Sequence, residues 1–168
     1  MVPRAALAGR NEQILKLLPE KGADVDTLSK YHGSALYAAS AEGHEQIVEL
    51  LLKEGADVNA TGYNCGSALG AASGGGHEQI VKLLLDKGAD VNATGERYGS
   101  ALRAASGGGH EQIVKLLLSK GADVNASGGC YGSALQAASS QGYEQIVKLM
   151  LEMGADVHAL GGSFGNAI

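Results

Sequence analysis

Two kinds of segment recur along the chain, and they differ in the pattern of their apolar and polar residues. In the stretch 99–121, a short segment of small residues, Ala101–Ser106, has Leu102 as its main apolar anchor. The segment after it carries large aliphatic residues at positions 113, 114, 116, 117 and 118, a spacing that gives a helix a broad apolar stripe. The pattern therefore predicts a small-residue first helix followed by an amphipathic second helix.

Signals for helix ends flank both segments. Ser100 suits an N-cap, because its hydroxyl can accept hydrogen bonds from the free amides at a helix start. The glycines 107–109 weaken and end the first helix, and Glu111 suits the positive end of the second helix dipole. Gly121 is a stop signal, and a turn is expected from Asp123 onward. Each segment pair therefore reads as helix, tight turn, helix and projecting loop.

The same arrangement recurs with a period of 33 residues. The string GADV begins at Gly22, Gly55, Gly88, Gly121 and Gly154. GSAL begins at Gly33, Gly66, Gly99 and Gly132, with GNAI at Gly165. HEQIV begins at His44, His77 and His110, with variants at Asn11 and Tyr143. A helix pair cannot bury its apolar faces alone, so neighbouring pairs are expected to stack into one continuous core.

We therefore predict a single all-α solenoid over residues 1–168. The predicted units are a partial unit 1–25, the complete units 26–58, 59–91, 92–124 and 125–157, and a partial unit 158–168. Terminal repeats normally carry a polar outer face, whereas the last complete unit, with Leu149 and Met150, has only a stub to cover it. We expect the chain to be a fragment of a longer array.

The 33-residue period and the string GHEQIVKLLLSKGADVNA at Gly109–Ala126 resemble ankyrin repeats. The resemblance implies stacked helix pairs with projecting β-turn or hairpin loops, and a non-enzymatic role in protein–protein interaction. The family's Thr-Pro-Leu-His-x-Ala stretch appears here as Ser100–Ala105, and its histidine is replaced by Tyr37, Gly70, Arg103 and Gln136 in successive units. The GSALxAAS variant looks like the arrays of filamentous fungi, which are often attached to receptor-type nucleotide-binding proteins.

Charge and composition argue against several classes of partner. The formal net charge is −5, which does not favour a phosphate backbone, and no run of about 18 apolar residues suggests a membrane span. Residues 1–18 lack the pattern of a signal peptide, and two cysteines do not make a disulfide framework. We expect an intracellular, cytoplasmic protein that binds neither nucleic acid nor membrane.

The residues that suggest chemistry have simpler structural interpretations. His44, His77 and His110 suggest a metal site, but equivalent residues of stacked units lie about 8–10 Å apart, so we expect them to support the turn before the second helix. Three asparagines, Asn59, Asn92 and Asn125, lie in N-x-[ST] sequons and are expected to be turn residues; their modification stays open. No nucleophile with its base is evident, so no catalytic residue, metal or cofactor is predicted.

Partner recognition is expected where the units differ. Residues 59–91 and 92–124 differ at five positions, of which three lie in the projecting loop and one on the first helix. The resemblance implies that these two regions line the binding face. The candidate partner-binding residues are Lys30, Tyr37, Tyr63, Asn64, Gly70, Gly74, Glu96, Arg97, Arg103 and Gln136. The alternative function is a structural spacer, or a self-stacking array that associates end to end through uncapped termini.

Overall fold

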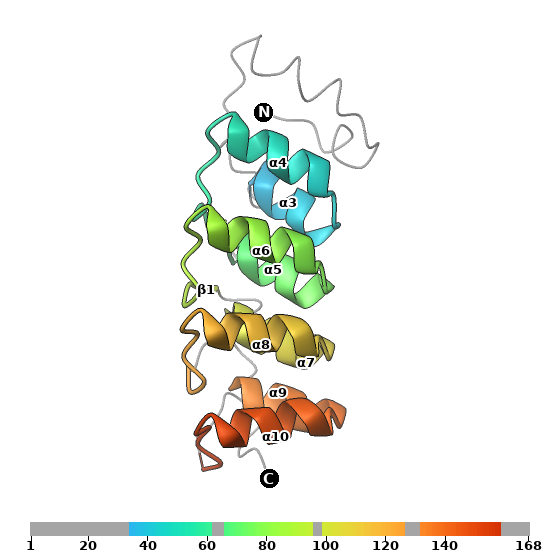
Figure 1. Cartoon of the computed structure of the whole chain (residues 1–168), viewed down its shortest axis with the longest axis vertical. Coiled ribbons are helices and arrows are strands. Elements are labelled where there is room, and N and C mark those ends of the chain that lie inside the picture. The colour runs from blue at the N-terminus through green and yellow to red at the C-terminus, as the bar shows by residue number, and fades with distance from the viewer. Residues whose placement is uncertain (1–33, 62–65, 96–98, 127–131, 159–168) are drawn as a thin grey trace.

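The computed structural model describes residues 34–61, 66–95, 99–126 and 132–158. Within these residues the chain forms helix pairs that stack one above another in a column (Figure 1). The helices are α3 (Ala35–Ala41), α4 (Glu45–Lys53), α5 (Ala68–Gly75), α6 (Glu78–Asp86), α7 (Ala101–Gly108), α8 (Glu111–Ser119), α9 (Ala134–Gln141) and α10 (Glu144–Glu152). Each predicted complete unit contains one such pair, and the predicted helical solenoid is confirmed.

Each first helix begins at the serine that the sequence predicts as its N-cap. The side-chain oxygens of Ser34, Ser67 and Ser100 accept a hydrogen bond from the backbone amide three residues later, at 3.1, 3.1 and 3.2 Å. Helix α7 continues to Gly108, two residues beyond the predicted end at Ser106. The helix ends only at Gly109, whose φ of 75° is left-handed and costs glycine little.

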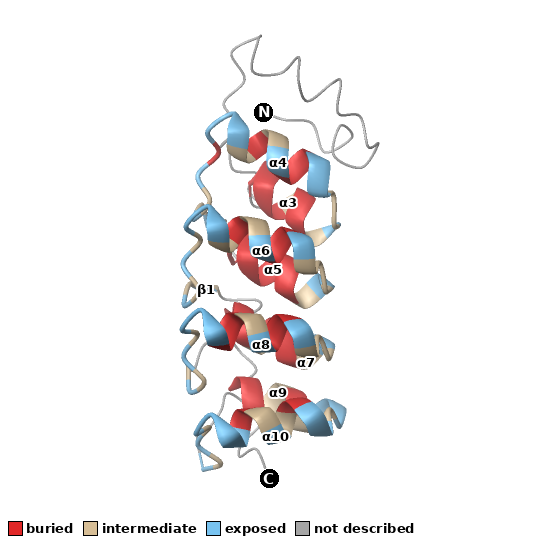
Figure 2. Cartoon of the chain, viewed as in Figure 1, coloured by how far each residue is buried: buried red, intermediate tan, exposed pale blue. Residues whose placement is uncertain are grey.

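The core lies between successive helix pairs and runs the length of the described stack (Figure 2). On the first helices it consists of one leucine and of alanines at equivalent positions, such as Leu102 and Ala105 in α7. On the second helices it consists of residues such as Ile113, Val114 and Leu117 in α8. The first helices contact one another more extensively than the second helices do, because their small side chains permit close approach.

A two-stranded hairpin projects between α6 and α7. Strand β1 (Thr94–Gly95) pairs antiparallel with β2 (Gly99–Ser100), with Thr94 opposite Ser100 and Gly95 opposite Gly99. A methyl group added to Gly95 would overlap the Cα of Gly66 in the preceding unit. Neighbouring loops therefore pack backbone against backbone at this point, which requires that Gly95 has no side chain.

Candidate partner-binding surface

The described candidate residues all lie on the first helices, which together form the first-helix face. Tyr37 lies on α3, Gly70 and Gly74 on α5, Arg103 on α7 and Gln136 on α9. The remaining candidates fall outside the described residues: Lys30, Tyr63, Asn64, Glu96 and Arg97. The structure thus brings half of the predicted set onto one face.

Burial differs within this set. Tyr37 is only 8% exposed and packs against Ala71 of α5, with Ala41 beside it. Gly70 is also buried, whereas Gly74, Arg103 and Gln136 are half-buried. Tyr37 therefore contributes chiefly by filling space between α3 and α5, and the more accessible part of the predicted surface begins at Gly74.

Gln136 has a defined structural task. Its side-chain oxygen accepts from the Ser133 amide at 3.0 Å, while its own amide donates to the Ser133 hydroxyl at 3.3 Å. This reciprocal arrangement is a capping box, which fixes the start of α9. The side chain of Gln136 thus has a structural role at the start of α9.

Glycines leave part of the first-helix face as bare backbone. An added methyl at Gly70 would lie 3.4 Å from the Ser67 hydroxyl, and one at Gly107 would lie 3.5 Å from the Ala137 methyl. Both distances are ordinary contacts, so small side chains fit at these positions. Gly70 is itself buried, so of these two glycines only the half-buried Gly107 presents backbone that a partner can approach.

Adjacent units are joined by a contact that the sequence analysis did not identify: a ring that lies on a glycine of the preceding unit. The ring of His77 covers Gly43 and that of His110 covers Gly76, so an added methyl on either glycine would lie 2.5 Å from ring carbon Cε1. Nε2 of His77 donates to the Ala41 carbonyl at 3.2 Å, and Nε2 of His110 to the Gly74 carbonyl at 3.1 Å. We call this arrangement the ring-on-glycine joint.

These two histidines thus have a structural contact, but it is made to the turn of the preceding unit. Each ring nitrogen must carry a proton toward its carbonyl, because a carbonyl oxygen can only accept. The signal in the sequence is a Gly-His or Gly-Tyr pair that recurs with the 33-residue period. The sequence alone does not reveal this contact, because the ring reaches a residue 34 positions earlier, in the preceding unit.

The first described histidine, His44, has a carboxylate beside it. His44 Nε2 lies 3.1 Å from a carboxylate oxygen of Glu42, which occupies the position held by Gly75 and Gly108 in the next two units. A methyl at Gly75 would lie 2.6 Å from the His77 ring, so a side chain at that position interferes with the ring. At Gly75 and Gly108 the absence of a side chain leaves the space that the histidine ring of the same unit occupies.

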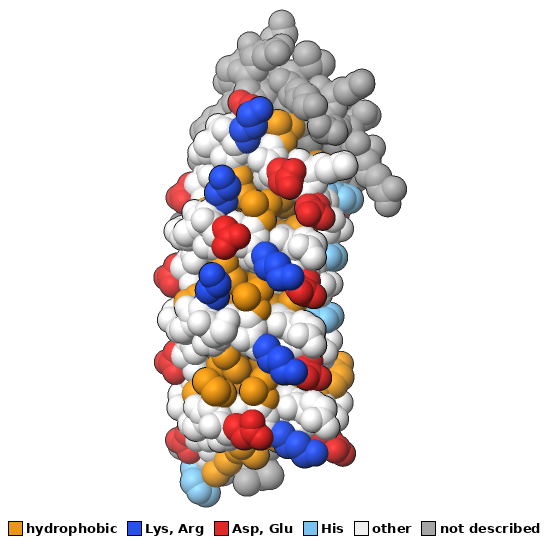
Figure 3. Space-filling model, in the orientation of Figure 1, with side chains coloured by type: hydrophobic (Ala, Val, Ile, Leu, Met, Phe, Trp, Pro, Cys, Tyr) orange, Lys and Arg blue, Asp and Glu red, His pale blue; other side chains and the backbone are white. Residues whose placement is uncertain are grey.

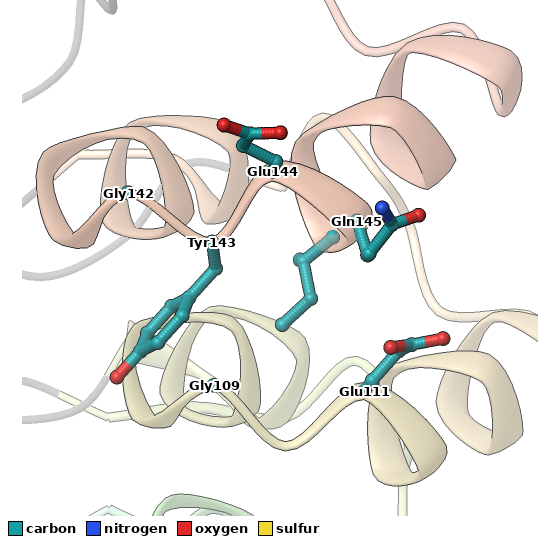
Figure 4. A pocket seen from close by; sticks show the side chains of 7 residues that line it. Gly109, Glu111, Gly142, Tyr143, Glu144 and Gln145 are labelled. Atoms are coloured by element: carbon teal, nitrogen blue, oxygen red, sulfur yellow. The ribbon is translucent and has the colours of Figure 1, made fainter.

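Tyr143 replaces histidine at the last described joint. Its ring covers Gly109, where an added methyl would lie 2.6 Å from Cζ. Beside it lies a hollow of about 370 Å³ (Figure 4). The hollow is lined by Gly109, Glu111, Gly142, Tyr143, Glu144, Gln145 and Ile146. In Figure 4 the carboxylates of Glu111 and Glu144 point away from the tyrosine ring and from each other, so the polar groups do not converge on a ligand.

Asparagine side chains form a second repeated contact, which joins one turn to the next. The Asn92 side chain donates to the Gly121 carbonyl at 3.2 Å and accepts from the Asp123 amide at 2.8 Å. Asn59 and Asn125 make the same two bonds to the turns that follow them. The predicted turn role of these residues is confirmed, and each amide also bridges to the next turn.

The face formed by the second helices α4, α6, α8 and α10, which we call the outer face, carries interspersed charges of both signs (Figure 3). Lys82 pairs with Glu78 at 2.7 Å, and Lys115 pairs with Glu111 one unit later at 2.5 Å. These exposed pairs lie one helical turn apart and contribute only a few tenths of a kcal/mol each, about 0.3–0.5. On α6 and α8, charges of opposite sign thus pair within the same helix.

Stacked helix pairs of fixed length, joined by the same contacts at each step, define a repeat solenoid. The family model for ankyrin repeats in three copies matches residues 4–95 and 69–160. Since these matches span most of the sequence, the chain belongs to the ankyrin-repeat family. Comparison with curated proteins finds no match.

Membership in this family supports protein–protein interaction in general terms, without naming a partner. The matched segments are ankyrin repeats alone, which are typically non-catalytic. Among the described helices, none combines the length and the apolar character needed to cross a membrane.

Proposed function

We propose that the array is a non-enzymatic module that binds a protein partner through the first-helix face and the loops next to it. The observation that carries the proposal is the distribution of differences between the near-identical units 59–91 and 92–124. The residues of the ring-on-glycine joint and of the asparagine bridge are the same in both units. The first-helix position differs, with Gly70 in one unit and Arg103 in the other.

The chemistry of the first-helix face suits a protein partner. Arg103 offers a guanidinium that can bind a carboxylate or a carbonyl through two parallel hydrogen bonds. Arginine is among the residue types enriched at the energetic centres of protein interfaces. The bare backbone around Gly74 and Gly107 lets a partner segment lie close beside it. Recognition by an array within a larger intracellular receptor-type protein agrees with these features.

The test is affinity capture with the full chain, read by quantitative mass spectrometry. Proteins retained by the unmodified array are compared with those retained by two variants. Arg103→Ala removes the guanidinium, and Gly74→Gln places a side chain on the bare surface. We expect the specific partner to be lost from both variants and kept by Gln112→Ala, which removes an exposed amide from the outer face. Equal retention by all four proteins would contradict the proposed surface. If the unmodified array retained no protein specifically, the spacer function would be favoured.

A further inference from the structure

The first helices of the described units carry a single charged side chain. Arg103 is the only charged residue within α3, α5, α7 and α9, whose sequences otherwise consist of alanine, leucine, glycine, serine, tyrosine and glutamine. The outer face differs, because its Lys82 and Lys115 lie beside the carboxylates of Glu78 and Glu111. The first-helix face therefore offers a partner a guanidinium and no carboxylate.

Arg103 lies at the boundary between the protein and water. The residue as a whole is half-buried, and its Nε atom is buried. Its backbone is fixed at the start of α7, where its amide donates to the Ser100 hydroxyl at 3.2 Å. Opposite charges attract more strongly at such a boundary than in bulk water, because less water screens them. A guanidinium in this place therefore favours a charged carboxylate over a neutral carbonyl.

The helices on either side of α7 contribute no charge. Helix α5 presents half-buried backbone at Gly74, and α9 presents the exposed Ser140, whose hydroxyl donates to the Ala137 carbonyl at 3.0 Å. Helices in contact lie about 8–10 Å apart, and an extended peptide advances about 3.3 Å per residue. A peptide that crosses the helices with a carboxylate at Arg103 thus reaches α5 and α9 about three residues away. A second charge placed there would lose water without meeting an opposite charge, which is unfavourable.

The charge of the whole chain limits the partner further. The formal net charge is −5, and exposed aspartates recur at successive turns, at Asp57, Asp90 and Asp123. Each additional carboxylate in a partner would be repelled by this excess of acidic groups, and the first helices hold no second guanidinium to offset the repulsion. The complement of this surface is therefore a segment with one carboxylate and not an acidic run.

We propose that the first-helix face recognises a peptide segment of its partner that carries one aspartate or glutamate, with uncharged residues over about three positions on each side. The carboxylate binds the Arg103 guanidinium through two parallel hydrogen bonds. The near-identical unit 59–91 has Gly70 at the equivalent position and offers no such contact, so the segment is held in one register along the stack. This inference rests on the proposed function and goes further, because it states the chemistry that selects the partner.

The test uses the full chain and synthetic peptides of random sequence with acetylated and amidated ends, so that every carboxylate belongs to a side chain. Peptides retained by the immobilised array are identified by mass spectrometry, and their affinities are measured by fluorescence anisotropy. We expect a single aspartate or glutamate in the retained peptides, and its change to asparagine or glutamine should weaken binding at least about tenfold. The same change should have little effect with Arg103→Gln, a variant that takes the residue found at the equivalent position 136.

A matched control separates a specific pair from the general effect of charge. Arg103→Gln combined with Ser119→Arg keeps the formal charge of the chain but moves the positive charge to the exposed end of α8, and it should bind as weakly as Arg103→Gln alone. Recovery of binding in this double variant would overturn the inference. Retained peptides that are lost with Gly74→Gln but do not need their carboxylate would overturn it and leave the proposed function standing. Peptides that bind all these variants equally would contradict both, as would the retention of none.

Discussion

Single residues in one glycine run carry three separate tasks. Gly107 has room for a side chain, since an added methyl only touches Ala137. A methyl at Gly108 would lie 2.6 Å from the His110 ring, and Gly109 has the left-handed φ that ends α7 beneath Tyr143. The sequence predicted the run correctly as a helix end. It could not separate the three roles, because two of them depend on where a ring lies.

The first prediction separates Gly107 from Gly108 by alanine substitution. Gly107→Ala should raise the free energy of unfolding by up to about 1 kcal/mol, because alanine favours the helix and meets no obstacle. Gly108→Ala should lower it by about 1–2 kcal/mol, since the His110 ring must leave its place. Urea unfolding measures both. In a His110→Ala background the Gly108→Ala penalty should vanish; an unchanged penalty there would refute the ring as its cause.

The burial of Tyr37 is a second feature of a single residue that the sequence did not predict. Its chemistry suits recognition, and its position on the first helix was predicted correctly. Its burial arises because the next unit offers Ala71 at the contact, which leaves space that the tyrosine ring fills. The residue type and the helix position of Tyr37 could be predicted from the sequence. Its contact with the small residue Ala71 of the next unit could not, because that contact depends on how the units pack.

At the scale of elements, each turn is tied to the turn of the next unit. The sequence predicted the turns from Asp and Asn, and the Asp123 side chain indeed accepts from the Asn125 amide at 2.9 Å. It did not predict the bridge, because Asn92 and its partner Asp123 are separated by 31 residues and meet only after stacking. Local propensity thus defines each helix pair, and side chains that cross between pairs set their register.

The second prediction tests the asparagine bridge. Asn92→Ala removes two hydrogen bonds between successive turns and should lower the free energy of unfolding by about 1 kcal/mol, a modest loss because water can replace bonds at an exposed site. The Asp123 amide should also exchange its hydrogen faster. Gln112→Ala, which removes an exposed amide of similar chemistry from α8, should change neither measurement. Equal effects of the two substitutions would show that the bridge contributes nothing specific.

For the whole molecule, stability should be close to a sum over units and their joints. The described stack shows the same contacts at successive steps, so no single unit is the centre of the fold. The period in the sequence was sufficient to predict this architecture, since it repeats without a slip. The predicted unit boundaries and the predicted loop contacts of Tyr63 and Arg97 stay predictions.

The third prediction concerns removal of a complete unit. Deleting residues 92–124 joins Val91 to Asn125 in phase, brings Tyr143 onto Gly76 and restores an asparagine at the bridge position. We expect a folded array with a lower urea midpoint and a smaller dependence of stability on urea, because less surface is exposed on unfolding. Circular dichroism and urea titration measure both. A deletion protein without helical signal in mild buffer would contradict modular folding.

The ring-on-glycine joint has a consequence for the gene. Each of the units 59–91 and 92–124 carries both halves of the contact: a ring that covers the glycine of the unit before it, and a glycine that is covered by the ring of the unit after it. Recombination between copies in phase therefore adds or removes whole units of 33 codons and regenerates a complementary joint at the crossover. Tyr143 shows that the joint also accepts a second type of ring. A lineage can thus lengthen, shorten or reorder such an array in one genetic event, while point mutation alters the side chains that face outward.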